Sequence, residues 1–226
     1  MSSAEDGFVP RDRARWPFGY GDHKGQASRP KARAGLVRED EIASTPESEL
    51  WPHPACLAEN VLLEQCDVVP GRSGGPGGQN RNKVSTQITL KHLPTGLMAQ
   101  AGERRSQMEN RHVAVVRLRL VLAVEHRAAV PKGRGLALLD LPAGSVLWRS
   151  RVRGRKIACN PSHWDFPSML AEALDVLADM GFEPRRAALM LDVSASQLIR
   201  LVAEHPPALL LVNAERQKRA KHALKP

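Results

Sequence analysis

The sequence contains few aromatic residues, few cysteines and no long apolar run. Phe, Trp and Tyr make up 4% of the 226 residues, and none lies between residues 66 and 130. That region therefore lacks an aromatic surface on which nucleic-acid bases could stack. Cys56, Cys66 and Cys159 are too few for a fully paired disulfide framework and too scattered for a zinc cluster. We expect no metal site, no cofactor and a reducing compartment.

Membrane insertion and secretion are also disfavoured. No apolar run approaches the roughly 18 residues that span a bilayer. Glu5, Asp6 and Asp12 stand where a secretory signal needs an apolar stretch. The sequence predicts a cytoplasmic protein without membrane contact, and its length allows one or two small domains.

Charge is distributed unevenly along the chain. Residues 1–50 hold 8 basic and 9 acidic side chains without sustained periodicity, which predicts a disordered leader. Residues 71–160 hold 17 basic and 4 acidic side chains, a net charge of +13, against +9 for the whole chain. Such an excess favours contact with a polyanion, above all a nucleic-acid backbone. The alternative is a basic surface that is merely solvated.

Residues 54–130 are predicted to form an α+β domain. A short helix over 55–65 precedes strands at 66–69, 87–93 and 97–101, the last two forming a hairpin around Pro94-Thr95-Gly96. A long helix follows over 106–126, with a capping box and a helical apolar repeat at Val113, Val116, Leu120 and Val124. We expect this helix to pack on a small mixed β-sheet. A polar stripe recurs every seven residues along it, and either tracks a phosphate backbone or faces solvent: Arg105, His112, Arg119 and His126.

Residues 131–160 are predicted to form a basic β-hairpin, with strands at 146–152 and 155–159 joined at Arg153-Gly154. Residues 161–215 indicate a small helical module, and Arg185 to His205 resembles a helix-turn-helix pair. That module is either a nucleic-acid reader or a packing or protein-binding unit. Residues 216–226 form a basic tail. Further expectations are a C-terminal helix cap at Gly181, a first-turn proline at Pro184, a capping box at Ser194 and Gln197, burial of Trp148 and Trp164 against the C-terminal helices, and structural roles for Cys159, His163 and His92.

The most informative segment is the glycine-rich loop from Gly71 to Lys83, which reads GRSGGPGGQNRNK. A Walker loop needs Gly before its Lys and Ser or Thr after it, whereas Asn82 and Val84 flank Lys83. A dinucleotide fingerprint needs a helix after the loop, whereas a hairpin is predicted there. A flexible linker is disfavoured because the polar end of the loop runs directly into a strand.

The loop and its surroundings resemble the catalytic domain of peptide chain release factors. The resemblance covers about residues 64–126 and rests on matched groups in order: Arg72-Ser73-Gly74, Gly77-Gly78-Gln79, Asn82, Ser85, His92 to Gly96, Arg105-Ser106-Gln107 and Asn110-Arg111. It implies a ribosome-dependent enzyme that hydrolyses the ester joining a nascent peptide to P-site tRNA. The implied partners are large-subunit rRNA and peptidyl-tRNA, with a glutamine methyltransferase for Gln79. We expect the chain to act as a monomer.

The resemblance also assigns roles to residues. Gly77, Gly78 and Gln79 are the expected catalytic residues, because glycines permit close approach to the tRNA end and Gln79 can help to hold the tetrahedral oxyanion. No His, Asp, Glu, Cys or Tyr lies between Gly71 and Lys83, so a general base must come from the substrate or from RNA. The expected RNA contacts are Arg72, Ser73, Arg81, Asn82, Lys83, Arg105, Arg111, Arg119, Arg216, Lys218, Arg219 and Lys221.

Two kinds of relative are distinguished by what precedes the loop. Stop-codon-reading factors carry a Pro-x-Thr or Ser-Pro-Phe tripeptide in a further domain, and neither occurs in a strand context before Gly71. Codon-independent ribosome rescue is therefore favoured, although rescue factors have only a short linker where this chain has a hairpin and a helical module. The alternatives are a non-catalytic RNA- or ribosome-binding protein and a quality-control factor that acts on split subunits.

Overall fold

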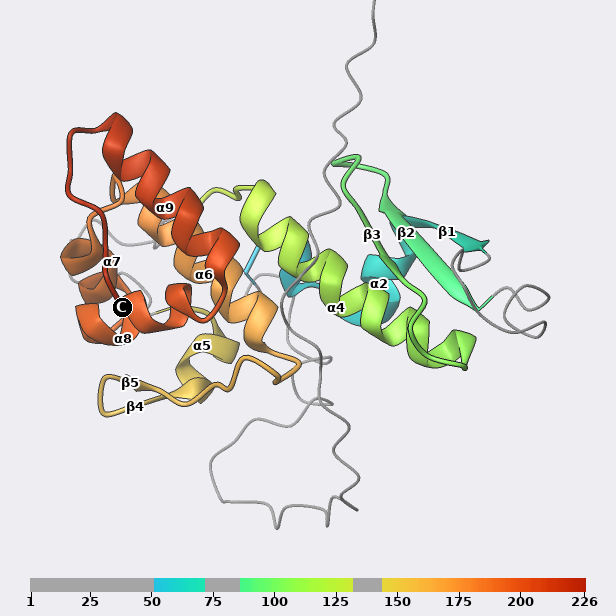
Figure 1. The fold of residues 1–226 in the computed structure, drawn as a ribbon. Helices are drawn as coiled ribbons and strands as arrows, with labels where there is room; N and C mark the ends of the chain where they lie inside the picture. Colours follow the sequence, from blue (N-terminus) through green and yellow to red (C-terminus); the bar gives the residue numbers. More distant parts are fainter. Residues whose placement is uncertain (1–50, 72–85, 132–143) are drawn as a thin grey trace, which may run out of the picture. The chain divides into compact units, whose positions relative to one another are not determined.

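The computed structural model describes residues 51–71, 86–131 and 144–226 (Figure 1). The predicted disordered leader, residues 1–50, lies outside this part of the chain. Within it, no helix is long and apolar enough to cross a membrane. The elements, labelled as in Figure 1, are η2 (Pro54–Cys56), α2 (Glu59–Glu64), β1 (Cys66–Gly71), β2 (Gln87–His92), β3 (Met98–Ala101), α4 (Gln107–Glu125), α5 (Val146–Arg151), β4 (Val152–Arg153), β5 (Lys156–Ile157), α6 (Phe166–Asp179), α7 (Pro184–Met190), α8 (Ala195–Ala203) and α9 (Pro206–Lys218).

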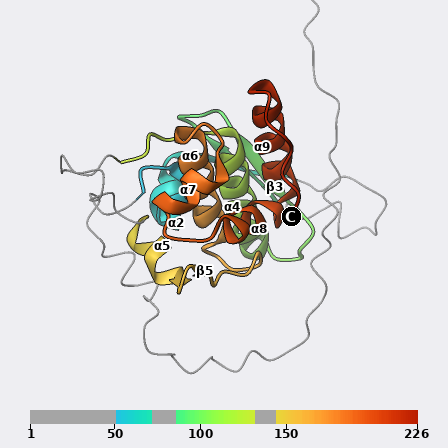
Figure 2. The ribbon, with the colours of Figure 1, turned by 90° about the vertical axis from the view of Figure 1, so that its left-hand side faces the viewer.

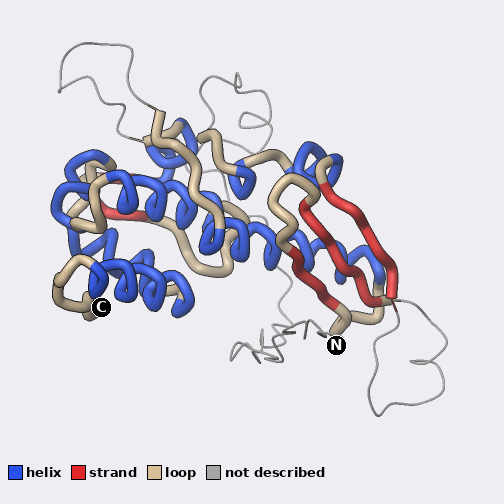
Figure 3. The backbone as a smooth tube through the Cα atoms, turned by 90° about the horizontal axis from the view of Figure 1, so that it is seen from above, coloured by secondary structure: helices blue, strands red, loops and turns tan. Residues whose placement is uncertain are grey.

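The predicted α+β fold is confirmed, with one difference in its sheet. Strands β1, β2 and β3 lie in that order and pair antiparallel throughout (Figure 3), so the described sheet is antiparallel and not mixed. The predicted hairpin is formed by β2 and β3. Ile88 and Leu90 alternate onto the buried face that meets α4, as period-2 patterning requires.

The long helix α4 forms as predicted, but it buries a different face. Ser106 accepts a hydrogen bond from the Glu109 N–H at 3.5 Å, which confirms the N-cap. Its fully buried apolar positions are Ala114, Val115, Leu118, Leu122 and Ala123. Of the predicted apolar set only Val124 is buried, and the other three are partly covered. The reason is that α4 packs against both the sheet and α6, so its covered face is wider than one stripe.

The predicted helix over 55–65 is interrupted. A 3-10 turn, η2, ends before Leu57, whose backbone is extended, and α2 begins only at Glu59. His53 starts the turn by accepting the Ala55 N–H at 3.0 Å. The interruption leaves the Leu57 carbonyl available to Arg119 of α4, a long-range contact that local periodicity does not reveal.

The predicted basic hairpin is much shorter than expected, because the first predicted strand is helix α5. Ser145 caps α5 by accepting the Trp148 N–H at 3.1 Å. Only Val152–Arg153 and Lys156–Ile157 pair as strands, around the two-residue turn Gly154-Arg155. Both turn residues have positive φ (52° and 62°), as such tight hairpins require. The sequence predicted a strand over 146–152, but the serine cap and the burial of Trp148 favour a helix over 146–151.

The C-terminal part is helical, as predicted (Figure 2). Gly181 ends α6 with φ 63°, Pro184 begins α7, and Ser194 caps α8 by accepting the Gln197 N–H at 3.2 Å. Helices α7 and α8 form the predicted helix-turn-helix pair. Trp148 is fully buried and donates to the Leu191 carbonyl at 2.8 Å, which confirms its predicted packing.

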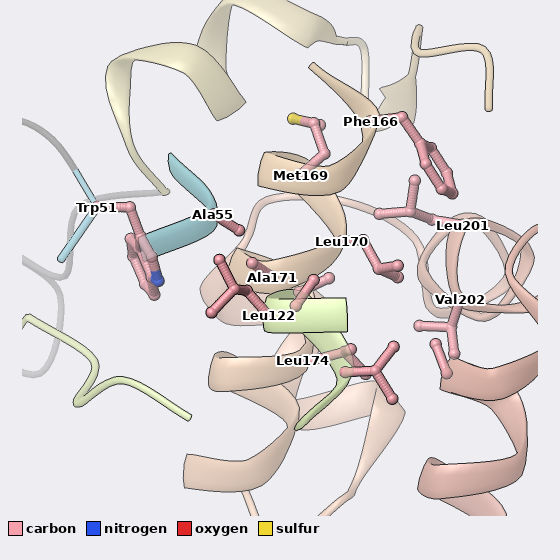
Figure 4. Packing of buried hydrophobic residues seen from close by; sticks show 14 of the residues in the cluster. Trp51, Ala55, Leu122, Phe166, Met169, Leu170, Ala171, Leu174, Leu201 and Val202 are labelled. Carbon is pink, nitrogen blue, oxygen red and sulfur yellow. The ribbon is translucent and has the colours of Figure 1, made fainter. Parts of the chain in front are cut away.

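One hydrophobic cluster extends from α4 into α6 and the C-terminal helices. Figure 4 shows Leu122 of α4 beside Ala171 of α6. Polar contacts also join the segment that precedes α2 to α6: Trp51 Nε1 donates to Asp175 of α6 at 2.9 Å, and the Ser168 hydroxyl donates to the Ala55 carbonyl of η2 at 2.9 Å. Residues 54–130 and 161–215 therefore share a core across the boundary at which the sequence suggested separate domains.

Candidate functional site

Strands β1 and β2 form the base of the glycine-rich loop. Gly71, the last residue of β1, pairs with Gln87, the first residue of β2, and Pro70 pairs with Ile88. Antiparallel pairing thus brings the two ends of residues 72–85 together. The predicted loop residues themselves lie outside the described part of the chain: Arg72, Ser73, Gly77, Gly78, Gln79, Arg81, Asn82 and Lys83.

Asn110 of α4 fixes the end of the loop base where the chain enters β2. Its side chain is fully buried and makes three hydrogen bonds. Nδ2 donates to the Thr86 carbonyl at 2.6 Å and to the Arg104 carbonyl at 2.9 Å, and Oδ1 accepts the Arg104 N–H at 2.9 Å. One amide therefore ties the exit of the loop to the turn that precedes α4. In the sequence, Asn110 stands next to the capping box of Ser106 and Glu109 and belongs to the Asn110-Arg111 group of the resemblance. Neither feature predicts its hydrogen bonds to Thr86 and Arg104.

His92 stands at the opposite end of β2. Its side chain is fully buried, with Nδ1 2.8 Å from Thr95 Oγ1 and Nε2 3.0 Å from Gln65 Oε1. Burial lowers its pKa below the ordinary value, which favours the neutral ring that a hydrogen-bonded structural histidine needs. The predicted structural role is confirmed by these contacts.

Several exposed cations lie on the turn before α4 and on its first turns. Arg104, Arg105 and Arg111 are exposed, so the predicted RNA contacts Arg105 and Arg111 are accessible. An open hollow of about 630 Å³ lies beside Arg111 and is lined by Glu59, Asn60, Leu63 and Glu64. Its two glutamates make it unsuited to a phosphate. Among the described residues no group of three or more His, Cys, Asp or Glu side chains is placed to hold a metal ion.

Arg119 is the first predicted RNA contact that the structure corrects. It is 3% exposed, donates to the Leu57 carbonyl and lies 4.3 Å from the centre of the Trp164 ring. Burial lowers its pKa. A seven-residue repeat drifts by about 20° per heptad around a straight helix, and α6 covers the second half of α4. Of the predicted polar stripe, the side chains of Arg105 and His112 are therefore exposed, whereas the side chain of Arg119 is buried.

Trp164 packs beside Arg119 against α4, which corrects the predicted burial of its side chain against the C-terminal helices. Its ring stacks on His112 of α4, with ring centres 4.8 Å apart, while Arg119 covers the ring at 4.3 Å. The side chain is partly buried against α4, whereas the sequence predicted burial against the C-terminal helices. Cation–π contact with a desolvated guanidinium explains why this tryptophan is held there.

The predicted basic tail is folded back. Arg216 belongs to the last turn of α9, is 9% exposed and donates to the Phe182 and His222 carbonyls, so it is not the RNA contact predicted. Lys221 bridges Glu183 at 2.7 Å, and the backbone of Leu224 pairs with the Asn213 amide. Lys218 and Arg219 are exposed, and each pairs with Glu215.

Comparison with known proteins finds a family domain that matches the loop together with the strands and the helix beside it. The RF-1 domain model matches residues 61–135, which include strands β1, β2 and β3, the loop and α4. Residues 61–135 are therefore similar to the RF-1 domain. This match and the relatives below support the resemblance to the catalytic domain of class I peptide chain release factors that the sequence indicated.

Three relatives show how far the similarity extends. The chloroplastic peptide chain release factor PrfB1 of Arabidopsis thaliana is 35% identical over 122 residues, 50% of this chain and 26% of that protein. Peptide chain release factor 1 of Acidiphilium cryptum is 43% identical over 118 residues, 47% of this chain and 33% of that protein. Peptide chain release factor 1 of Symbiobacterium thermophilum is 27% identical over 205 residues, 85% of this chain. That match covers 53% of the relative, so the chain spans at most about half the length of these proteins.

Proposed function

We propose that this chain hydrolyses the peptidyl-tRNA ester in the peptidyl-transferase centre of the ribosome, and that it does so without a stop codon. The observation that carries the hydrolase part is the Gly77-Gly78-Gln79 sequence within an RF-1 domain whose loop ends are held together by β1–β2 pairing. The relatives are named as peptide chain release factors. The partners in this proposal are large-subunit rRNA and P-site tRNA.

In the proposed mechanism the loop supplies positioning and hydrogen-bond donors. The ester is attacked by water, and the tetrahedral oxyanion needs donors that are already oriented. Gln79 provides such a donor, while Gly77 and Gly78 allow the backbone to approach the tRNA end closely. Because the sequence from Gly71 to Lys83 holds no side chain able to act as a base near neutral pH, proton transfer is assigned to substrate or ribosomal RNA groups.

Codon independence is the finer part of the proposal. Its support is that residues 1–70 contain neither the Pro-x-Thr nor the Ser-Pro-Phe tripeptide of the stop-codon-reading factors. In this proposal a glutamine methyltransferase modifies Gln79, and the chain acts as a monomer.

The decisive experiment is peptide release from purified ribosomes that carry labelled peptidyl-tRNA and have no codon, a sense codon or a stop codon in the A site. The wild-type protein is expected to release peptide in all three cases, and Gly78→Ala and Gln79→Ala are expected to abolish release. Gln87→Ala is the matched control, because Gln87 lies at the base of the loop and, among the described residues, its side-chain amide donates to Gln100 Oε1 of β3 at 3.1 Å. Its release activity should stay near wild type.

Each part of the proposal fails on a separate result. Release only with a stop codon would overturn codon independence. Release only from isolated large subunits would identify a factor for split ribosomes. Ribosome binding without release on any complex would overturn the hydrolase assignment and leave an RNA-binding protein.

A further inference from the structure

The β3–α4 turn, residues 102–105, joins the end of β3 to the start of α4 (Figure 1). Arg117 of α4 binds the strand and the turn together. Its Nη1 donates to the Gln100 carbonyl of β3 at 2.8 Å and to Glu103 Oε2 at 3.2 Å, and its Nη2 donates to Glu103 Oε1 at 2.6 Å. Glu103 Oε2 also accepts the Gly102 N–H at 3.0 Å. One arginine of the helix therefore holds the end of the strand and the beginning of the turn.

The Arg117–Glu103 pair differs from an ordinary surface ion pair. The two side chains are 38% and 45% exposed, and ion pairs at such exposure usually contribute little to stability. Here, however, two parallel hydrogen bonds join the guanidinium to the carboxylate, an arrangement that fixes orientation. Each partner also binds a main-chain group, the Gln100 carbonyl or the Gly102 N–H. The pair is therefore suited to fixing the position of the backbone more than to stabilising the fold.

The same turn is bonded to the exit of the glycine-rich loop. Asn110 lies seven residues before Arg117 on α4, and residues at this spacing share a helix face. Its side chain binds the N–H and the carbonyl of Arg104 in the turn, and the carbonyl of Thr86 where the chain enters β2. Arg117 and Asn110 therefore hold the two halves of one turn to one helix. A shift of the turn moves Arg104, and with it the amide that binds Thr86.

Strand pairing connects the same groups a second time. Gln100, whose carbonyl binds Arg117, pairs with Thr89, and the next residue of β3, Ala101, pairs with Ile88. Ile88 follows Thr86 by two residues. The end of β3 that Arg117 holds is therefore also the strand end that lies beside the entry into β2.

We propose that Arg117 and Glu103 position the exit of the glycine-rich loop for hydrolysis of peptidyl-tRNA, acting through Arg104 and Asn110. They are positioning residues, because their side chains contact β3 and the turn, and they bind no reacting group. The inference rests on the proposed function. Its physical basis is that an ångström of misplacement at a reacting centre can cost about 100-fold in rate. The contacts that hold the ends of the loop therefore affect the rate.

The test separates turnover from binding. Arg117→Met removes the donors and keeps the length of the side chain, and Glu103→Ala removes the carboxylate. Release by the full-length protein is followed on purified ribosomes with no codon in the A site, at increasing concentrations of the ribosomal complex. Each variant is expected to lower kcat by about tenfold and to leave KM near wild type, because neither residue is proposed to contact RNA. The double variant should be no slower than either single variant, because the two residues act as a pair.

Two controls exclude a general loss of structure. Arg200→Met makes the same substitution at an exposed arginine of α8 and should leave kcat unchanged. Arg117→Lys keeps a charged donor and should recover most of the rate. The amide NMR signals of Thr86 and Arg104 should shift in Arg117→Met and stay in place in Arg200→Met. All rates are measured at a temperature at which circular dichroism shows each variant folded.

The positioning role is overturned if Arg117→Met keeps the wild-type kcat and leaves the Thr86 signal in place. It is also overturned if Arg117→Met raises KM at unchanged kcat, which would identify Arg117 as an RNA contact, or if the losses of the two single variants multiply in the double variant. Absence of release by the wild type would overturn the proposed function itself. Release by the wild type together with full activity of both single variants would overturn the positioning role alone.

Discussion

Asn110 shows how a single buried amide can decide the geometry of a loop that it does not belong to. It satisfies the Thr86 carbonyl and both backbone groups of Arg104. A buried polar group left without a partner costs about 1–3 kcal/mol. The residue therefore supports both the fold and the position of the loop exit.

Asn110→Ala is expected to lower the free energy of unfolding by about 3 kcal/mol, because three bonds are lost and buried backbone groups are left without partners. Urea denaturation measures the loss, and peptide release should fall with it at temperatures where the variant remains folded. Met108→Ala is the control, since Met108 is 81% exposed on the same helix and should change stability by less than about 0.5 kcal/mol. Equal losses in both variants would contradict the role assigned to Asn110.

Glu172 is the residue that should make stability depend on pH. Burial raises its pKa to about 7, even though its two oxygens accept from the Ser145 N–H and hydroxyl at 2.7 Å. The folded state therefore binds a proton more tightly than the unfolded chain does. The stabilisation from that proton is complete below the ordinary pKa of 4.5 and is lost as the pH rises through about 7.

Wild type should accordingly lose stability relative to Glu172→Gln as the pH rises from 5 to 7.5, by about 2 kcal/mol. Thermal or urea unfolding of both proteins at several pH values gives this difference. The two proteins share the buried histidines His53 and His205, whose pKa values are lowered by burial to about 3 and about 4. These histidines make the folded state more stable as the pH rises, the opposite of Glu172, and because both proteins contain them their effect cancels in the difference between the two proteins. A difference that is constant with pH would show that Glu172 does not titrate in this range.

At the scale of elements, the turns between helices depend on two glycines for different reasons. Gly144, before α5, has φ 77°, and a Cβ there would lie 2.6 Å from Trp148 and 2.7 Å from Glu172 Oε1. Gly181, after α6, has φ 63°, and a Cβ there would meet nothing within 4 Å. Both need the left-handed backbone, but only Gly144 also needs the absence of a side chain.

Gly181→Ala should therefore cost about 1 kcal/mol, the conformational penalty alone. Gly144→Ala should cost at least about 3 kcal/mol, because the buried Trp148 must also move. Chemical denaturation of the two variants under the same conditions provides the comparison. Equal effects would show that the contact of Gly144 with Trp148 and Glu172 does not constrain the start of α5.

At the scale of the whole molecule, the RF-1 domain and the C-terminal helices are expected to unfold together. The hydrophobic cluster is continuous between α4 and α6, and Asp175 of α6 binds Trp51, Arg127 and the Ala128 N–H. A shared core leaves neither part with a complete core of its own.

Leu122→Ala in α4 should cost about 2–5 kcal/mol, and it should reduce hydrogen-exchange protection in β2 and in α6 by the same factor. Leu189→Ala, at a position 72% exposed, is the control and should leave both unchanged. If β2 lost protection while α6 kept it, the two parts would be independent domains, as the division of the sequence into 54–130 and 161–215 suggested.

The sequence by itself determined the features that local chemistry controls. The β2–β3 hairpin, the Ser106 and Ser194 caps, and the Gly181 helix end follow from short-range patterns and hydrogen bonds within a few residues. The similarity to the RF-1 domain was also readable from the sequence, because the matched groups around the loop are ordered along the chain.

Tertiary structure decided what depends on distant neighbours. Arg119 turned from a surface cation into a buried one because Leu57 and Trp164 cover it, and Arg216 did so because α9 packs where Phe182 and His222 offer carbonyls. Residues 146–151 form a helix because Trp148 is buried and donates to the Leu191 carbonyl. Sequence periodicity records which residues share a face, but burial of a face is set by the elements that pack on it.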